Sequence, residues 1–405
     1  MANSLPEDAL AEILVKLPVK TLLRFCCVSK TWFALINSPY FEDKHLKYLH
    51  SKNRKVVLVK RFIKNEFKTL LSFHSHDEDE SLPSVAPNIE LPSWNRYSFD
   101  IYGACNGIVC FSDLSEIHLC NPATRQFLTL PPSLRFDPPK GFKSVSPHAL
   151  GFGFDPSTQD YKVVKLYKLY PKSRSNYSYL GMVMGVQIYK LCTNSWRKVD
   201  LILPQVVNIY PPCFPATVNG CFHWDASDID PESGSVMRNI LSFNMCTEVF
   251  RKIEYPSDAR QPHVRPDVFV LDGDLAAISI KFPYLPFSSL LYEETMDIWV
   301  MMEYGVKESW IKKFSLQTPM AGLNLPLSSW NDDKLLLLQR VGEDGCLISR
   351  SLRDNSQAIM KYDIFGTELT LRAIVYQETL VSLSARGDGL SWRNMDDQPG
   401  ESESY

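Results

Sequence analysis

The sequence lacks the features that mark membrane, secreted and nucleic-acid-binding proteins. No apolar run reaches the roughly 18 residues that a helix needs to cross a bilayer. The first eight residues have neither the basic start nor the apolar core of a signal peptide. Lys and Arg number 43 against 46 Asp and Glu, so the formal net charge of −3 gives no electrostatic reason to expect nucleic acid or a membrane as a partner. We therefore expect a cytoplasmic or nuclear protein.

Ten cysteines occur without a Cys-x-x-Cys pair. In a chain of 405 residues, long enough for a large core, this pattern indicates reduced and mostly buried thiols. The nearest approach to a zinc half-site, Cys105 with Cys110, has no second half-site. Two histidines and four acids over residues 74–80 are more typical of a solvated acidic loop than of a metal site. No metal is expected.

Common catalytic motifs are also missing. The segment from Gly151 to Asp155 has two glycines but not the third that a dinucleotide fingerprint requires. There is no G-x-S-x-G elbow, no P-loop and no HExxH pattern. His223 could serve as a general base, but a histidine hydrogen-bonded within a sheet is the more common case. We expect a non-catalytic protein without a cofactor.

The sequence does contain a short helical region over residues 4–49. Ser4, followed three residues later by Glu7, predicts a capping box. An apolar stripe at helical spacing comes next, formed by Leu10, Ile13, Leu14 and Leu17. Pro18 is expected to end this helix. A second helix and a third, capped by Ser29 and stopped by Pro39, should follow. Three short helices cannot bury all their apolar faces among themselves, which predicts a surface for a partner.

Beyond residue 50 the apolar period changes from 3.6 to 2, and strands are predicted over 55–62 and 69–73. Two elements then repeat. The first is a tight turn before an apolar strand, as at Asn106-Gly107 and Asn219-Gly220. The second is a hairpin whose return strand begins with a large residue. These residues are Phe127, Trp196, Phe250, Trp310 and Leu369.

A repeat of about 50–60 residues with about four strands predicts an all-β domain, namely a six-bladed β-propeller of kelch-like spacing. The large residue in each repeat is expected to fill the wedge between neighbouring blades. Five repeats are visible, and strands near 56–59 and 374–383 are expected to pair and complete the sixth. A β-sandwich with a coincidental period is the alternative.

The helical region resembles a known family. Leu5-Pro6-Glu7-Asp8, Leu17-Pro18-Val19-Lys20 and Val28-Ser29-Lys30, followed by Trp32, are similar in order and spacing to the F-box motif of plant proteins. The resemblance implies a module that binds a Skp-family adaptor and, through it, a cullin scaffold. An ordinary three-helix bundle is the alternative. The residues expected to contact the adaptor are Leu5, Pro6, Ile13, Leu14, Leu17, Pro18, Leu22 and Trp32.

The repeat region resembles the F-box-associated domain of plants. The residues that carry this resemblance are Asn121-Pro122-Ala123-Thr124-Arg125, Gly151 to Asp155 and Asp160 to Val164. Further segments are similar to the S-locus F-box proteins of pollen and their vegetative relatives. These are Tyr189 with Ser195-Trp196, Phe222-His223-Trp224 and Met302 to Trp310. The expected domains are the F-box over 1–50, connecting strands with an acidic, proline-rich loop over 51–100, the propeller over 101–383 and a disordered tail over 384–405.

The two resemblances together imply a substrate receptor of a Skp-cullin-F-box (SCF) ubiquitin ligase, which binds a protein target for degradation. Non-self S-RNases are the implied targets if the S-locus resemblance holds. A defence, hormone or metabolic regulator is the alternative target. A propeller scaffold or enzyme without a ligase role is the alternative of another class.

Loops at one propeller mouth are expected to bind the target. The longest insertions between repeats are 132–147, 170–181, 206–215, 256–266 and 283–294. The cations expected to face a target are Arg135, Lys140, Lys143, Lys172, Arg174, Arg260 and Arg265. Acidic residues gather in other connections, at 77–80 and 225–232. Ordinary surface variation is the alternative explanation of these charges.

Overall fold

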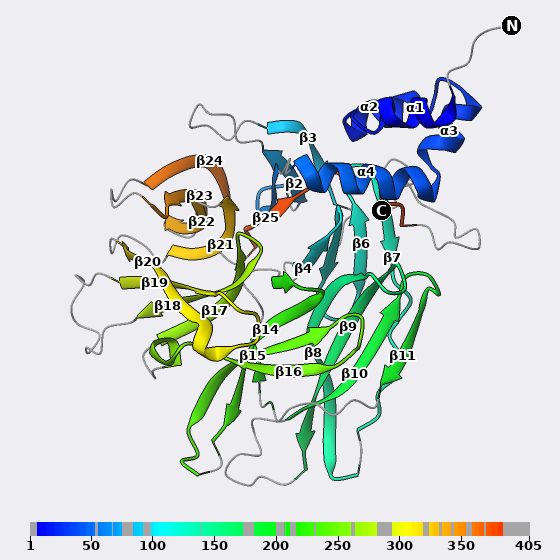
Figure 1. The fold of residues 1–405 in the computed structure, drawn as a ribbon. Helices are drawn as coiled ribbons and strands as arrows, with labels where there is room; N and C mark the ends of the chain where they lie inside the picture. The colour runs from blue at the N-terminus through cyan, green and yellow to red at the C-terminus, as the bar shows by residue number, and fades with distance from the viewer. Residues whose placement is uncertain are drawn as a thin grey trace, which may run out of the picture.

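The computed structural model describes most of the chain between Pro6 and Leu383. The described segments are residues 6–52, 56–66, 68–74, 84–91, 99–138, 140–172, 182–199, 206, 208–210, 216–230, 232–260, 264–281, 294–318, 324–331, 334–341, 344–353, 359–367 and 370–383. The acidic run at 77–80 and the predicted tail over 384–405 lie outside them. Figure 1 shows a group of helices standing on one side of a body built from small sheets.

Four helices form the N-terminal module, one more than the sequence predicted. They are α1 Glu7–Leu14, α2 Val19–Phe25, α3 Lys30–Ile36 and α4 Pro39–Lys52. The Ser29 hydroxyl accepts a hydrogen bond from the Trp32 amide at 3.1 Å, as predicted for the cap of α3. The predicted capping box is wrong, because α1 begins after Pro6 and has no side-chain cap. Pro39 starts α4 instead of only ending α3, since the first helical position tolerates proline.

Six antiparallel sheets form the blades of a β-propeller. Blade 1 contains β4 Asp100–Cys105, β5 Ile108–Ser112, β6 Ile117–Asn121 and β7 Gln126–Thr129. Blade 2 contains β8 Phe142–Asp155, β9 Asp160–Pro171, β10 Met182–Lys190 and β11 Ser195–Val199. Blade 3 contains β12 Asn208–Ile209, β13 Ala216–Val218, β14 Cys221–Ile229, β15 Val236–Asn244 and β16 Phe250–Glu254. The 3-10 helix η1 Ser257–Arg260 follows it.

The other three blades complete the ring. Blade 4 contains β17 Val264–Leu271, β18 Asp274–Lys281, β19 Glu294–Met301 and β20 Trp310–Thr318, with the 3-10 helix η2 Lys307–Ser309 before β20. Blade 5 contains β21 Asn324–Asn331, β22 Lys334–Val341, β23 Asp344–Ser351 and β24 Ile359–Thr367. Blade 6 contains β25 Arg372–Tyr376 together with β1 Val56–Ile63, β2 Lys68–His74 and β3 Ser84–Glu90. The predicted six-bladed propeller is confirmed.

Blade 6 closes the ring with strands from both ends of the domain. β1 pairs antiparallel with β25, from Val56 opposite Tyr376 to Lys60 opposite Arg372, as the sequence predicted. The Arg372 guanidinium then bonds Asp100 of blade 1 at 2.7 Å. Pairing at the seam leaves no free strand edge there. The propeller therefore begins at β1, well before residue 101, where the sequence analysis placed its start.

The strand order places successive connections on alternate faces of the propeller. Neighbouring strands are antiparallel, so the connections after the first and third strands of a blade share one face, and the remaining connections share the other. The helices lead into β1, which is the second strand of blade 6, and β25 is the first. The helices before β1 and the residues that follow β25 therefore lie on the face that carries the turns after β4 and β6. We call it the helix face and its opposite the far face.

Large residues on the outer strands fill the wedges between blades, as predicted. The Trp196 indole donates to the Pro131 carbonyl at 2.8 Å, and the Trp310 indole donates to the Glu254 carbonyl at 2.9 Å. Each carbonyl lies at the end of the preceding blade, so each indole bonds one blade to the next. Both tryptophans are buried. Leu369 lies outside the described residues.

A buried ion-pair network joins blades 2 and 3. The Lys162 ammonium lies 2.7 Å from an Asp155 carboxylate oxygen and 2.9 Å from Glu248, which also pairs with Arg197. Burial opposes the ionisation of Asp155, but hydrogen bonds from Lys162 and Ser157 outweigh it and hold the pKa of that carboxyl well below its ordinary value. The network stabilises the joint between the two blades only while the carboxylates are charged.

Replacing Lys162 by Met is expected to lower the free energy of unfolding by about 3–5 kcal/mol, because the change leaves the Asp155 carboxylate buried without its cation. Urea denaturation of the full chain at pH 7 measures this loss. The double variant Lys162→Met/Asp155→Asn should recover part of it, since neither charge is then unpaired. Because the pKa of Asp155 is lower in the folded chain than in the unfolded chain, its ion pair stabilises the fold at pH values above the ordinary pKa of Asp. This contribution is lost as the pH falls below about 4. Equal wild-type and Lys162→Met stabilities would contradict the assignment.

Candidate adaptor and target interfaces

The helical module has its own apolar core. Leu14 and Leu22 are 1% and 0% exposed and pack with Phe41 of α4. Leu380, more than 300 residues further along the chain, completes the same cluster. Leu14 and Leu22 are therefore not available to a partner in this conformation.

The other predicted adaptor residues differ in exposure. Pro6, Ile13 and Pro18 are exposed, Ile13 by 52%. Leu17 and Trp32 are partly buried against the core of the module. Leu5 lies outside the described residues. The module thus offers part of the predicted set as accessible apolar surface.

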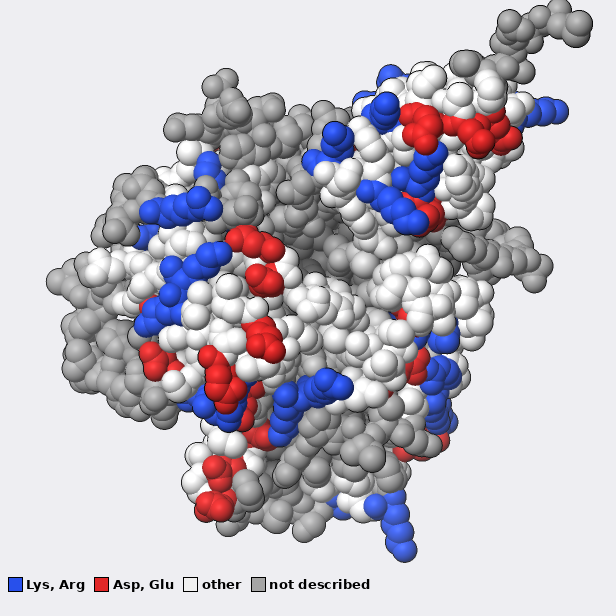
Figure 2. All heavy atoms as spheres, in the orientation of Figure 1, with Lys and Arg blue, Asp and Glu red and all other residues white. Residues whose placement is uncertain are grey.

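Three exposed apolar residues of the module were missed by the sequence prediction. Val28, Phe33 and Tyr40 are 63%, 55% and 56% exposed. The signal for Phe33 was present in the sequence, because Trp32, Leu35 and Ile36 are spaced to share one helix face and Phe33 falls outside it. On the face of the module that Figure 2 shows, Lys and Arg are interspersed with Asp and Glu. The exposed apolar side chains are the part of the module's surface best suited to contact a partner.

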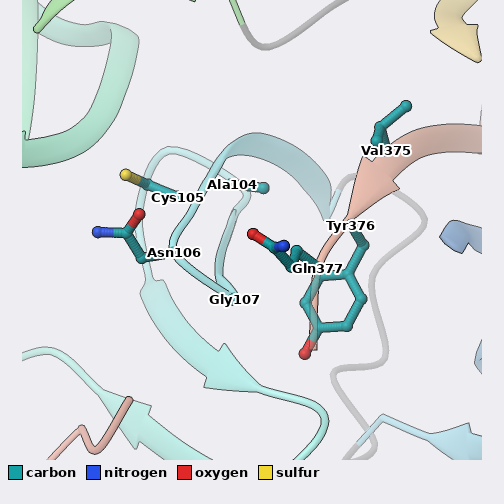
Figure 3. A pocket seen from close by; sticks show the side chains of 7 residues that line it. All are labelled: Ala104, Cys105, Asn106, Gly107, Val375, Tyr376 and Gln377. Atoms are coloured by element: carbon teal, nitrogen blue, oxygen red, sulfur yellow. The ribbon is translucent and has the colours of Figure 1, made fainter. Parts of the chain in front are cut away.

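Residues 377–383, which we call the C-terminal strap, hold the module to the propeller. The Asn121 amide donates to the Thr379 carbonyl at 3.1 Å and to the Val381 carbonyl at 2.7 Å. The Thr379 hydroxyl donates to the Asn106 carbonyl at 2.7 Å. Gly107 is at φ +80°, and a Cβ there would collide with the Thr379 side chain. Figure 3 shows this turn beside the start of the strap. The strap therefore lies against blade 1 and is hydrogen-bonded to it.

On its other side the strap contacts the helices. Leu380 enters the core of the module, and the Ser382 amide donates to a Glu42 carboxylate oxygen of α4 at 3.3 Å. Leu46 of α4 packs against the apolar cluster of blades 1 and 2. Figure 1 shows α4 lying across the ends of β6 and β7. The module is thus fixed to the helix face through α4 and the strap.

The described strands that flank the five long insertions predicted to carry recognition end or begin at the far face. By strand order, 132–147, 206–215 and 256–266 connect one blade to the next or begin its first strand, and 170–181 and 283–294 join second to third strands. The connections of both kinds emerge opposite the helices. A partner bound there would leave the helical module accessible.

The predicted cations divide into a group and two isolated pairs. Lys140, Lys143 and Lys172 are exposed at the end of the β8–β9 hairpin, where the Lys172 amide donates to the Gly141 carbonyl at 2.9 Å. Arg135 is paired with Asp137 at 2.7 Å, and Arg260 with Glu254 at 2.9 Å. Arg174 lies outside the described residues. Arg265 lies on β17, and its side chain is not described.

Family comparisons agree with this two-part architecture. Residues 3–44 match the F-box domain, and residues 55–373 match the F-box associated beta propeller domain. The chain belongs to the plant F-box proteins with an F-box-associated propeller. The family match to the propeller begins at β1, in agreement with the closure of blade 6.

Curated relatives of this F-box protein come from Arabidopsis thaliana. It is 27% identical over 354 residues to the F-box protein CPR1, covering 83% of this chain and 79% of the relative. It is 25% identical over 391 residues to the putative F-box protein At3g52320, covering 94% and 90%. Among solved structures, TolB from Acinetobacter baumannii matches with a TM-score of 0.43 and 12% identity, over 84% of this chain and 73% of TolB.

The motifs that carry the family resemblance lie at joints of the fold. Asn121 of the first motif holds the strap. Asp155 and Lys162 form an ion pair within blade 2, and Lys162 also pairs with Glu248 of blade 3. A Cβ on Gly151 would lie 2.6 Å from the Trp224 ring, so only glycine allows blade 3 to pack this closely. These residues explain how the propeller and its module are held together.

His223 has a structural role in this F-box protein. It is fully buried, its Nδ1 lies 3.0 Å from the Ala216 carbonyl and its Nε2 lies 2.8 Å from the Tyr304 hydroxyl. Burial lowers its pKa to about 4, so the ring is neutral near pH 7. The described residues contain no group of three His, Cys, Asp or Glu side chains placed to hold a metal ion. Among the helices described, none is long and apolar enough to cross a membrane.

Proposed function

We propose that this chain is the substrate-recognition subunit of an SCF ubiquitin ligase, acting in the cytosol or nucleus. Its helical module binds a Skp-family adaptor, which connects it to a cullin scaffold, and its far face binds the protein to be ubiquitinated. The chemistry is performed by another component of the complex. This chain contributes proximity, because it raises the effective concentration of target lysines near the transferred ubiquitin.

The observation that carries the proposal is the separation of the two surfaces. The helices lie on one face of the propeller, and the strand ends that flank the five long connections lie on the opposite face. Loops on a rigid frame are common binding elements because they vary without disturbing the core. The strap and α4 give the two surfaces a fixed relative position, as a receptor that presents a target requires.

The residues that suggested S-locus proteins do not identify the target. Trp196 and Trp310 bond one blade to the next, and Trp224 is fully buried, with its indole donating to the Leu150 carbonyl at 2.8 Å. Non-self S-RNases and other protein targets are therefore equally compatible with these motifs. The proposal names a protein target and assigns its recognition to the far face.

A loop exchange tests this assignment. Grafting the five far-face connections of a relative with a known target onto this chain should transfer binding and ubiquitination of that target in a reconstituted reaction. Grafting the relative's helix-face turns should transfer neither, because those turns lie on the side of the module. The melting temperature of each chimera controls for folding. Target choice that follows the helix-face turns would show that the recognition face is assigned wrongly.

A further inference from the structure

A cleft of about 420 Å³ lies between the helical module and the propeller. One wall is α2 and the turn after it, and the opposite wall is formed by blades 6 and 1 and the start of the strap. This cleft is separate from the exposed apolar residues of the module and from the far face. It is also several times larger than the cavity of about 110 Å³ that Figure 3 shows. Cys105 lines that smaller cavity, and burial raises the pKa of its thiol to about 12.

The rim of the cleft is positively charged. Lys20 and Arg24 are one helical turn apart on α2, so they share a face, and both are exposed. Arg125 lies across from them on the turn between β6 and β7 and is also exposed. Glu378 is the one acidic side chain among the lining residues described. Among the described lining residues, three cations stand against one carboxylate, and this balance favours an anionic occupant.

The walls of the cleft below these cations are apolar. Leu23 lines it from α2, Phe73 and Ile89 line it from blade 6, and Pro122 lines it from blade 1. Phe73 is only 3% exposed, so it forms part of the floor. An occupant that matches both features has an apolar body and an anionic group at one end.

The size and position of the cleft indicate the kind of molecule. Sites for small organic ligands usually measure about 300–1,000 Å³, are mostly apolar with a few polar groups, and often lie between domains. A protein partner generally contacts a broader and flatter surface. We propose that the cleft binds a small organic anion with an apolar body, whose carboxylate or sulfonate lies among Lys20, Arg24 and Arg125.

A pair of fluorescent probes tests both parts of the proposal on the full-length chain. 1-Anilinonaphthalene-8-sulfonate has an apolar body and a sulfonate, and N-phenyl-1-naphthylamine has the same body without the charge. The variant Arg24→Gln/Arg125→Gln should weaken binding of the sulfonate about tenfold, because two charge-assisted contacts are lost. Binding of the neutral probe should change less than twofold. Lys361→Gln, an exposed charge removal on β24, should affect neither probe.

Three exposed cysteines provide a readout of position. Cys27 lines the cleft, whereas Cys192 and Cys246 lie on the turns between the third and fourth strands of blades 2 and 3. Bound sulfonate probe should slow alkylation of Cys27 by iodoacetamide at least fivefold, by shielding its thiol, and leave the other two rates unchanged. The rates are followed by mass spectrometry of peptides.

Three results would overturn the proposal. One is an unchanged sulfonate affinity in the double variant, and another is an equal loss for the charged and the neutral probe. The third is sulfonate binding that occurs only after residues 384–405 are removed, since the cleft would then belong to the chain's own C-terminal segment. None of these outcomes depends on an adaptor or a target, so the proposed ligase role is tested separately.

Discussion

Replacing Ile13 and Phe33 together by Asp is expected to abolish co-purification of the full chain with a Skp-family adaptor. These side chains are 52% and 55% exposed, so the folded module should tolerate the change. In a complex, each carboxylate would be buried against apolar surface without a partner, which is strongly unfavourable. Apolar hot spots cost about 2 kcal/mol or more on truncation, about thirtyfold in affinity, and a double charge substitution should exceed this.

Val236→Asp is the matched control, because Val236 is 60% exposed and begins β15 at the far face. It introduces the same charge at a similarly exposed apolar position, and adaptor binding should be unchanged. Co-expression with the adaptor and calorimetric titration measure the affinities, and thermal melting shows whether each variant is folded. Undiminished binding by the Ile13→Asp/Phe33→Asp variant would exclude this surface as the adaptor contact.

The propeller was predictable because each repeat carries its own strong local signals. Asn106 and Asn219 adopt positive φ in the tight turns before apolar strands, as the Asn-Gly pairs indicated. The blade count followed from the period of these turns, and closure followed from the strands left at both ends. The fourth helix was harder to predict, because only Phe41 and His45 of the fourteen residues in α4 are buried. A helix with so little apolar surface has almost no periodic signal.

The site could be predicted only in part, because exposure depends on contacts between distant segments. Leu14 and Ile13 are neighbours on one apolar stripe, yet one is in the core and the other is at the surface. Phe41 and Leu380 decide which side of the stripe is covered, and no local pattern reveals Leu380 as a partner. The cleft was missed for the same reason, because Arg24 and Arg125 line one cleft only when the module is fixed to the propeller.

Three truncations of the C-terminus are expected to have sharply different effects. Removing residues 384–405 should leave the melting temperature unchanged, because Leu383 is the last residue of the strap. Removing 377–405 should keep the propeller folded but release the module, which loses Leu380 from its core and the hydrogen bond to Glu42. Removing 372–405 deletes β25, the innermost strand of blade 6, and should cause aggregation, because β1 then has an unpaired edge.

Asn121→Ala tests the same attachment without shortening the chain. Its loss leaves two strap carbonyls without their donor, which should cost about 1–3 kcal/mol. An exposed turn of blade 2 supplies the control, because Gln159→Ala removes an amide whose hydrogen bond goes to the local Pro156 carbonyl. Light scattering detects aggregation, and small-angle X-ray scattering detects release of the module as a larger radius of gyration. If all three truncations scatter alike and remain soluble, the seam does not close the propeller. If Asn121→Ala and Gln159→Ala are equally stable, the strap is held by other contacts.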